Sequence, residues 1–280
     1  MAERVINPEC GILRSIFKVR CPSSCTQPPA YSFFRNEKGE GCWVAHTVLT
    51  LIETLDLMKK VENALMARNI EPRCVIAAAL LHDIGKLSKE YTEKRYFYHN
   101  IASTMVCLKV LRHWAKEERS IVAQAVLLHH EERMWRELQK PDAPLIADYY
   151  NLIKRKKLKR VNMITNYLEV LDMLGKVMEY LPPANEVFNE LSSSLKLSSC
   201  SLSPSYESEL TNRRLASRFL PLYYLLQLAD NRAASAREGL YWRDILNQVA
   251  KNTGDDSEEF TNTLMTFGSR SRIFLTLSKI

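Results

Sequence analysis

Three largely apolar stretches of the sequence each end on histidine or aspartate side chains. The stretches are 74–81, followed by His82 and Asp83; 122–128, followed by His129 and His130; and 225–229, followed by Asp230. A helix that is apolar on all sides lies in a protein core. A carboxylate at the end of such a helix is costly unless it is paired or bound to a metal. The pattern therefore predicts buried helices that deliver metal ligands.

Two further histidines lie near the starts of amphipathic stretches. His46 follows Trp43, Val44 and Ala45, and His99 follows three aromatic residues. The chain has six histidines, and only His113 lies outside this set. We interpret His113 as a surface residue.

Helical periodicity extends over most of the chain. Apolar residues recur at three- and four-residue steps from Cys42 to about Arg68, and Pro72 suits the first turn of the next helix. Pro182 and Pro183 are expected to end a helix. The predicted helices are about 42–68, one from 72, 97–115, 117–131, 142–179, 186–195, one from 209 that carries Asp230 close to its end, 238–251 and 256–267.

The remaining segments have no such periodicity. Residues 1–41 are expected to be irregular, with a short β-hairpin formed by the strand-like stretches 15–20 and 31–35, and a turn-rich stretch 36–41. The Ser-rich stretch 192–208 is predicted to be a mobile loop or insertion. Because the candidate ligands span 46 to 230, residues 42–280 are expected to form one domain. The fold class is all-α, a helical bundle.

Composition changes this picture little. The 280 residues include only eight glycines, which disfavours a β-rich fold, and abundant Leu, Ala, Glu and Lys favour helix. The formal charge of +7 is compatible with a polyanionic partner. No apolar run reaches the length of a membrane span, and the N-terminus lacks a signal-peptide pattern. We therefore expect a cytoplasmic protein with no membrane partner.

Seven cysteines form an odd number and suit reduced thiols. Cys10, Cys21 and Cys25 cluster near the N-terminus. Three thiolates can hold zinc, but the Cys21–Cys25 spacing lacks a matching second pair. Ordinary thiols or an adventitious disulfide are the favoured interpretation.

The order His46, His82-Asp83, Asp230 resembles the HD superfamily of metal-dependent phosphohydrolases. The additional His99 and His129-His130 pair resembles the HD nuclease of type I CRISPR systems, which works with a helicase. This resemblance implies a helical bundle with two divalent metal ions and a catalytic pair, Asp83 and Lys86. One metal would be held by His46, His82, Asp83 and Asp230, and the other by His99, His129 and His130, with Asp83 as the bridge. One departure is that Glu131-Glu132-Arg133 follows His130, where this family more often has glycines.

The chemistry of phosphoryl transfer explains these residue types. Two cations roughly 3.5–4 Å apart can hold both oxygens of an in-line displacement, and a bridging carboxylate such as Asp83 sets that separation. Imidazoles favour Mn, Ni, Co, Fe or Zn over Mg, although the sequence leaves the metal open, Mg included. Lys86, in the HD-x-G-K stretch, would stabilise charge on the phosphate oxygens. The alternative for Lys86 is a charge that complements a helix dipole.

The segment 154–160 is strongly basic, with six cations in seven residues: Lys154, Arg155, Lys156, Lys157, Lys159 and Arg160. Such a run is either a solvated helix face or a set of phosphate contacts. Further candidates for phosphate contact are Arg213, Arg214, Arg218 and Arg232.

These observations predict a metal-dependent nuclease that hydrolyses phosphodiester bonds of single-stranded DNA, with RNA left open. The chain has no G-x-x-x-x-G-K-[ST] phosphate loop and hence no helicase motor of its own. By the resemblance, its partners would be a separate CRISPR helicase and an RNA-guided surveillance complex in antiviral defence. The alternatives are an HD phosphohydrolase of small nucleotides and an inactive HD adaptor.

The basic run provides the first testable prediction. If residues 154–160 contact phosphates, neutralising several of them should weaken binding to all single-stranded sequences alike, because phosphate contacts carry no base information. The slope of log affinity against log salt concentration, measured by fluorescence anisotropy, should also become shallower. An unchanged slope would identify the run as a solvated face.

Overall fold

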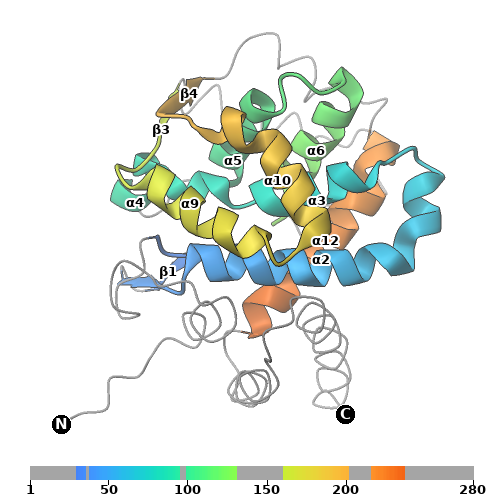
Figure 1. Cartoon of the computed structure of the whole chain (residues 1–280), viewed down its shortest axis with the longest axis horizontal. Helices are drawn as coiled ribbons and strands as arrows, with labels where there is room; N and C mark the ends of the chain where they lie inside the picture. Colours follow the sequence, from blue (N-terminus) through green and yellow to red (C-terminus); the bar gives the residue numbers. More distant parts are fainter. Residues whose placement is uncertain (1–29, 36–37, 95–98, 131–159, 202–215, 237–280) are drawn as a thin grey trace.

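The computed structural model describes residues 30–35, 38–94, 99–130, 160–201 and 216–236. Within these ranges the chain is mostly helical, with two small pairs of strands (Figure 1). The described helices are α2 (Trp43–Met66), α3 (Pro72–Leu81), the 3-10 helix η1 (Ile84–Leu87), α4 (Lys89–Lys94), α5 (His99–Val110), α6 (Lys116–Leu128), α9 (Tyr167–Met178), α10 (Pro182–Leu195) and α12 (Ala216–Ala236). This architecture confirms the all-α prediction.

Helix α3 forms the centre of the bundle. Its first turn contains Pro72, and every residue from Cys74 to Leu81 is buried. The helix packs against α2, α5, α6, α10 and α12. Burial of a large apolar side chain such as Leu80 or Leu81 contributes about 1.5–3 kcal/mol relative to exposure. The burial of these apolar side chains can therefore offset the free-energy cost of burying polar side chains where α3 ends.

Helix α2 is the longest described helix, and all of its residues from Trp43 to Leu55 are buried. After Met66 the backbone reverses at Asn69, whose φ of 53° lies in the left-handed region. Asparagine tolerates this conformation better than most residues. The N–H of Ile70 then donates to the carbonyl of Leu65, which closes the end of the helix and leads directly into α3.

Helices α2 and α12 pack against each other in opposite directions. Near the start of α12, Arg218 donates to the carbonyl of Arg68, just beyond the end of α2. Near the end of α12, Asp230 meets His46 in the first turn of α2. The antiparallel packing therefore brings a side chain from late in the sequence beside one from early in the sequence.

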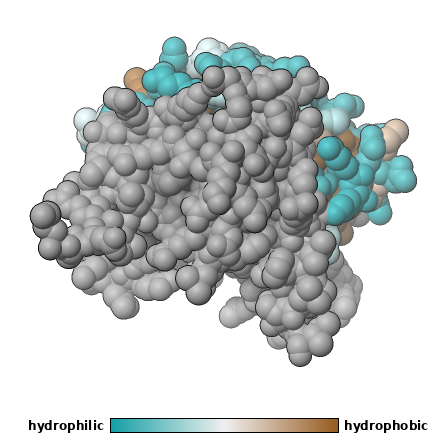
Figure 2. Space-filling view, turned by 60° about the horizontal axis from the view of Figure 1, so that its bottom comes forward, coloured by the Kyte–Doolittle hydropathy of each residue, from teal (hydrophilic) through white to brown (hydrophobic). Residues whose placement is uncertain are grey.

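Helices α9 and α10 pack against each other and cover α2, α3 and α5 (Figure 1). The prediction of a helix at 186–195 is confirmed and extended, since α10 begins at Pro182. The two prolines thus start this helix, where their missing N–H groups cost nothing. Where described surface is visible in Figure 2, it is mainly hydrophilic.

The N-terminal hairpin differs from the prediction. Strand β1 (Phe33–Arg35) pairs antiparallel with β2 (Lys38–Glu40), within the stretch that was predicted to be only a turn. The other predicted strand, 15–20, lies outside the described residues. Only two residues separate β1 from β2, so their pairing closes a shorter loop than a pairing of 31–35 with 15–20 would.

A second strand pair contradicts two further predictions. Strand β3 (Arg160–Asn162) pairs with β4 (Ser199–Ser201), so residues 160–166 do not continue the helix predicted for 142–179. The predicted Ser-rich loop also starts too early, because α10 extends to Leu195 and β4 follows it. The two strands bury Val161 and Cys200 opposite each other, and this tertiary contact outweighs local helix propensity.

The rest of the predicted Ser-rich loop (202–208) and the predicted helices 238–251 and 256–267 lie outside the described residues. None of the described helices is long and apolar enough to span a membrane. The predicted single domain over 42–280 stays a prediction, although the described helices share one hydrophobic core.

Candidate metal centre

All seven side chains predicted as metal ligands lie together in the structure, because three helices end or begin at one point. His82 and Asp83 directly follow α3, His129 and His130 directly follow α6, and His99 is the first residue of α5. The two remaining members, His46 and Asp230, come from the antiparallel pair α2 and α12. The side chains form two groups that share Asp83.

The first group consists of His46, His82, Asp83 and Asp230, all of them buried. The His46 Nε2 atom lies 3.2 Å from Oδ2 of Asp83 and 3.0 Å from Oδ1 of Asp230. The His82 Nε2 atom lies 3.4 Å and 3.6 Å from the same two oxygens. Two imidazole nitrogens and two carboxylate oxygens therefore converge, a donor set that suits a transition metal.

The second group consists of Asp83, His99, His129 and His130. Here the other oxygen of Asp83, Oδ1, lies 3.1 Å from the His99 Nε2 atom and 3.7 Å from that of His129. The Nε2 atoms of His99 and His130 are 2.7 Å apart. Asp83 thus directs one carboxylate oxygen into each group, as a bridge between two cations would require.

Several of the converging atoms lack a hydrogen-bond partner although they are buried. These include the Nε2 atoms of His82 and His129 and the Oδ1 atom of Asp83. Burial of a polar group without a partner costs free energy. Cations bound at these atoms would remove that cost, so the residues fit two metal ions.

The orientation of two imidazoles is fixed by the backbone. The Nδ1 atom of His82 lies 2.8 Å from the carbonyl of Ala79, and that of His129 lies 2.6 Å from the carbonyl of Val126. In a neutral ring, an Nδ1–H that donates to a carbonyl leaves the lone pair on Nε2, the atom that faces the cluster. Each contact joins residues three apart in sequence. The backbone at the end of each helix therefore fixes the orientation of the imidazole ring.

Electrostatics keep the carboxylates ionised. Burial alone would raise the pKa of Asp83, but the charges of Lys86 and His82 hold it well below its usual range. Burial would also raise the pKa of Asp230, but the adjacent His46 and His82 keep it well below its usual range. Both side chains are therefore anionic at neutral pH and available to cations.

The histidines divide into two classes. Burial opposes a charge on His82, yet Asp83 and Asp230 raise its pKa to about 10. Burial and the nearby Lys86 lower the pKa of His99 to about 4, and burial with His129 lowers the pKa of His130 well below the usual value. His99 and His130 are thus neutral and ready to bind metal, whereas a metal at the first group must displace a proton from His82.

Lys86 lies at this centre, in the last turn of η1. Its Nζ atom is 2.6 Å from Oδ2 of Asp83, and only 7% of its side chain is exposed. The ammonium therefore lies beside the shared carboxylate, where it can also face a bound anion.

Two contacts that hold the loop after α3 were missed by sequence reasoning. The indole N–H of Trp43 donates to the carbonyl of Asp83 at 2.9 Å, and the hydroxyl of Ser103 accepts from the N–H of Gly85 at 2.8 Å. A Cβ atom on Gly85 would lie 2.2 Å from the carbonyl oxygen of His99. The glycine of the HD-x-G-K stretch thus permits the close approach of η1 to α5.

Among the described residues, no other predicted functional residue joins the centre, and Arg213 and Arg214 lie outside the described part of the chain. Residues 154–159 of the basic run and the cluster Cys10, Cys21 and Cys25 lie outside the described residues. Arg160 lies in β3, where it donates to the hydroxyl of Ser199. Arg218 forms an ion pair with Glu117, and Arg232 forms one with Glu53. Their phosphate-binding role stays a prediction.

Comparison with known families agrees with this geometry. Residues 44–174 match the family model of the HD domain. This segment is therefore similar to the HD domain. This match supports the HD-domain phosphohydrolase superfamily and a metal-dependent hydrolase activity in general. No curated protein and no solved structure matches the chain significantly.

The matched HD segment contains six of the seven converging side chains, and Asp230 lies outside it. The packing of α12 against α2 is what brings Asp230 into the first group. The complete donor set is therefore a property of the fold beyond the matched segment.

Removal of the shared carboxylate provides a direct test of the metal centre. Protein purified without chelator should contain near-stoichiometric transition metal, and Asp83→Ala should lose most of it, because both groups use this side chain. Elemental analysis by mass spectrometry measures the content. The matched control is Asp172→Ala, which removes an exposed aspartate on α9. Equal metal content in Asp83→Ala and the wild type would contradict the shared-carboxylate geometry.

Gly85→Ala should separate η1 from α5. The added methyl group would overlap backbone atoms, and overpacking of this kind costs about 1–3 kcal/mol of unfolding free energy. We expect a lower melting temperature and reduced metal content. The control is Gly175→Ala in α9, whose Cβ would lie 3.1 Å from a Phe188 ring carbon while it improves helix propensity. If the two variants melt alike, the close approach at Gly85 does not constrain the fold.

Proposed function

We propose that this HD domain is a two-metal phosphodiesterase that cleaves single-stranded DNA in CRISPR antiviral defence, together with a separate helicase. The observation that supports this proposal most strongly is that the two carboxylate oxygens of Asp83 face different groups of ligands. Two cations held by these groups would suit a displacement at phosphorus, because together they would stabilise charge on the attacking and leaving oxygens.

The chain's own residues have distinct parts in this reaction. Asp83 would set the separation of the two cations, and His46, His82 and Asp230 would complete one coordination sphere while His99, His129 and His130 complete the other. When bound, the metals supply hydroxide near neutral pH and polarise the phosphate. The ammonium of Lys86 lies next to Asp83 and would neutralise charge that develops on the non-bridging oxygens.

Exposure within the centre indicates the side from which a substrate approaches. The side chain of His130 is 41% exposed and that of His99 is 16% exposed, whereas those of His46 and His82 are buried. A phosphate would therefore reach the second group first. A single strand bends into such a site without the deformation that a stiff duplex requires.

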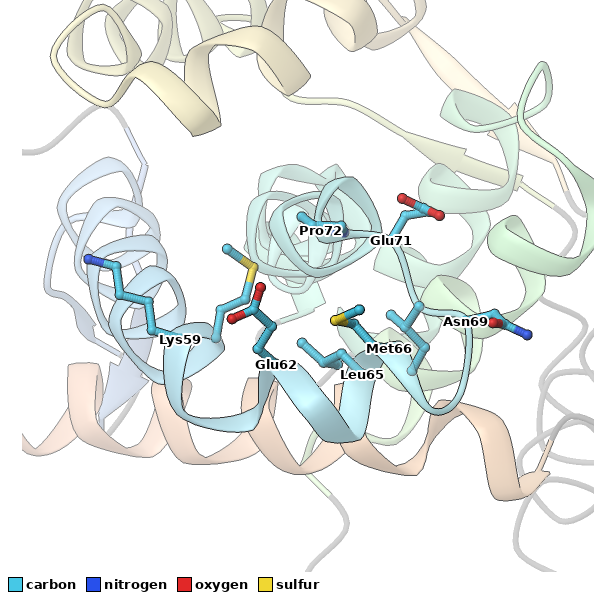
Figure 3. A pocket seen from close by; sticks show the side chains of 9 residues that line it. Lys59, Glu62, Leu65, Met66, Asn69, Glu71 and Pro72 are labelled. Atoms are coloured by element: carbon cyan, nitrogen blue, oxygen red, sulfur yellow. The ribbon is translucent and has the colours of Figure 1, made fainter.

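The alternative substrate, a free nucleotide, needs a pocket that encloses it. A cavity of about 460 Å³ does occur, but its lining runs from Met58 to Pro72 around the far end of α2 (Figure 3). It contains none of the converging histidines. This cavity therefore lies apart from the centre and would not enclose a nucleotide beside the converging side chains.

The third interpretation, an inactive adaptor, is disfavoured by the buried atoms without partners. A domain with no need for metal gains nothing from keeping the Nε2 atoms of His82 and His129 buried and unpaired. The helicase and the surveillance complex rest on the resemblance of the ligand order to CRISPR HD nucleases.

The proposed activity can be tested by cleavage of end-labelled single-stranded DNA with Mn, Mg or chelator. We expect metal-dependent cleavage, little cleavage of blunt duplex, and loss of about 10²-fold or more in His82→Ala and Asp83→Ala, as for removal of one preorganised stabilising group. His113→Ala is the matched control, because His113 is exposed and belongs to neither group.

The same assay distinguishes the alternatives. Rapid turnover of a free nucleotide, with single strands left intact, would replace the proposal with a small-nucleotide hydrolase. Stoichiometric metal without hydrolysis of either substrate would favour the adaptor. Faster cleavage of single-stranded RNA would keep the mechanism and change the substrate.

A further inference from the structure

A buried amide links the two helices that carry the second group of ligands. Asn100 is the second residue of α5 and is only 4% exposed. Its Nδ2 atom donates to the carbonyl of Leu127, near the end of α6, at 2.7 Å. This hydrogen bond joins backbone and side chain across 27 residues of sequence.

The acceptor belongs to the end of a helix, where carbonyl groups have no partner within the helix. Two of these carbonyls are occupied by side chains near the centre. The carbonyl of Val126 accepts from Nδ1 of His129, and the carbonyl of Leu127 accepts from Asn100. Two adjacent carbonyl groups at the end of α6 thus accept hydrogen bonds, one from the ligand His129 and the other from Asn100 of α5.

The ligands on either side of this link all belong to the second group. His99 precedes Asn100 directly, and His129 and His130 follow Leu127 within three residues. The link therefore sets the position of the start of α5 relative to the end of α6. The 2.7 Å separation between the Nε2 atoms of His99 and His130 depends on that position.

The first group is built from other elements. Apart from the shared Asp83, its ligands come from α2, from the end of α3 and from α12. The hydrogen bonds described for Asn100 run to Leu127 of α6 and to Thr104 of α5, and not to these three ligands. A change at Asn100 should consequently act on one group and leave the other in place.

We propose that Asn100 is a positioning residue that assembles the second metal group without contacting the metal. This inference rests on the proposed two-metal centre but not on the identity of its substrate. Removal of residues that orient metal ligands without contacting the metal typically changes metal affinity by about 10–100-fold.

The same helix offers a matched control. The hydroxyl of Thr104, which is 1% exposed, donates to the carbonyl of Asn100 at 2.8 Å. Thr104→Val removes one buried hydrogen bond of similar length but leaves the link to α6 intact. A comparison of Asn100→Leu with Thr104→Val therefore separates the link between helices from general weakening of α5.

The experiment is a titration of the full chain, stripped of metal with chelator, with Mn²⁺ followed by calorimetry and electron paramagnetic resonance. Wild-type protein and Thr104→Val should bind two ions and show the spectrum of a spin-coupled pair. Asn100→Leu should bind one ion with affinity within about twofold of wild type and the other at least about tenfold more weakly, with a spectrum of isolated Mn²⁺.

Circular dichroism and thermal unfolding first establish that each variant is folded. If leucine is not accommodated, Asn100→Ser removes the amide without added bulk, and the same result is expected. Equal weakening of both ions, or two unchanged ions, in a folded Asn100 variant would overturn the inference. Binding of a single ion to the wild-type protein would overturn both this inference and the two-metal centre. Failure of DNA cleavage alone would contradict the proposed substrate and leave the inference about Asn100 in place.

Discussion

The structure depends on one buried carboxylate. Asp83 is fully buried, and each of its oxygens faces a different set of imidazoles. An ion in this position is tolerated only where opposite charges surround it. Lys86 and His82 compensate part of the negative charge of Asp83. The unpaired nitrogen atoms around Asp83 indicate that cations compensate the rest. The apolar helices around it hold the cluster together and keep water from most of it.

Much of this centre could be predicted from the sequence because helix ends make a simple pattern. An apolar run long enough to be buried, followed directly by His82-Asp83 or His129-His130, indicates a polar group held in a core. The same logic located α2, α3 and α6 to within a few residues. Gly85 also has a sequence signal, since it lies in the HD-x-G-K stretch, two residues after Asp83, in a chain with only eight glycines.

Other features had no local signal. The pairing of β3 with β4 joins segments that are nearly 40 residues apart, so the local pattern at 160–166 predicts a helix instead of a strand. The contacts of Trp43, Asn100 and Ser103 are hydrogen bonds between a buried side chain and a distant backbone group. Such bonds depend on how helices pack, and the residue types that make them occur equally in ordinary helices.

The antiparallel packing of α2 and α12 also bears on how the protein folds. Glu53 and Arg232, which join these helices near the centre, are 179 residues apart in sequence. Closure of so long a loop carries an entropic cost, so the first group is complete only after distant parts of the chain have met. A ligand that binds only the folded chain stabilises it by mass action, by about 2.7 kcal/mol at a hundredfold excess over its dissociation constant. The supply of metal would then determine how much of the chain is folded as well as how fast it reacts.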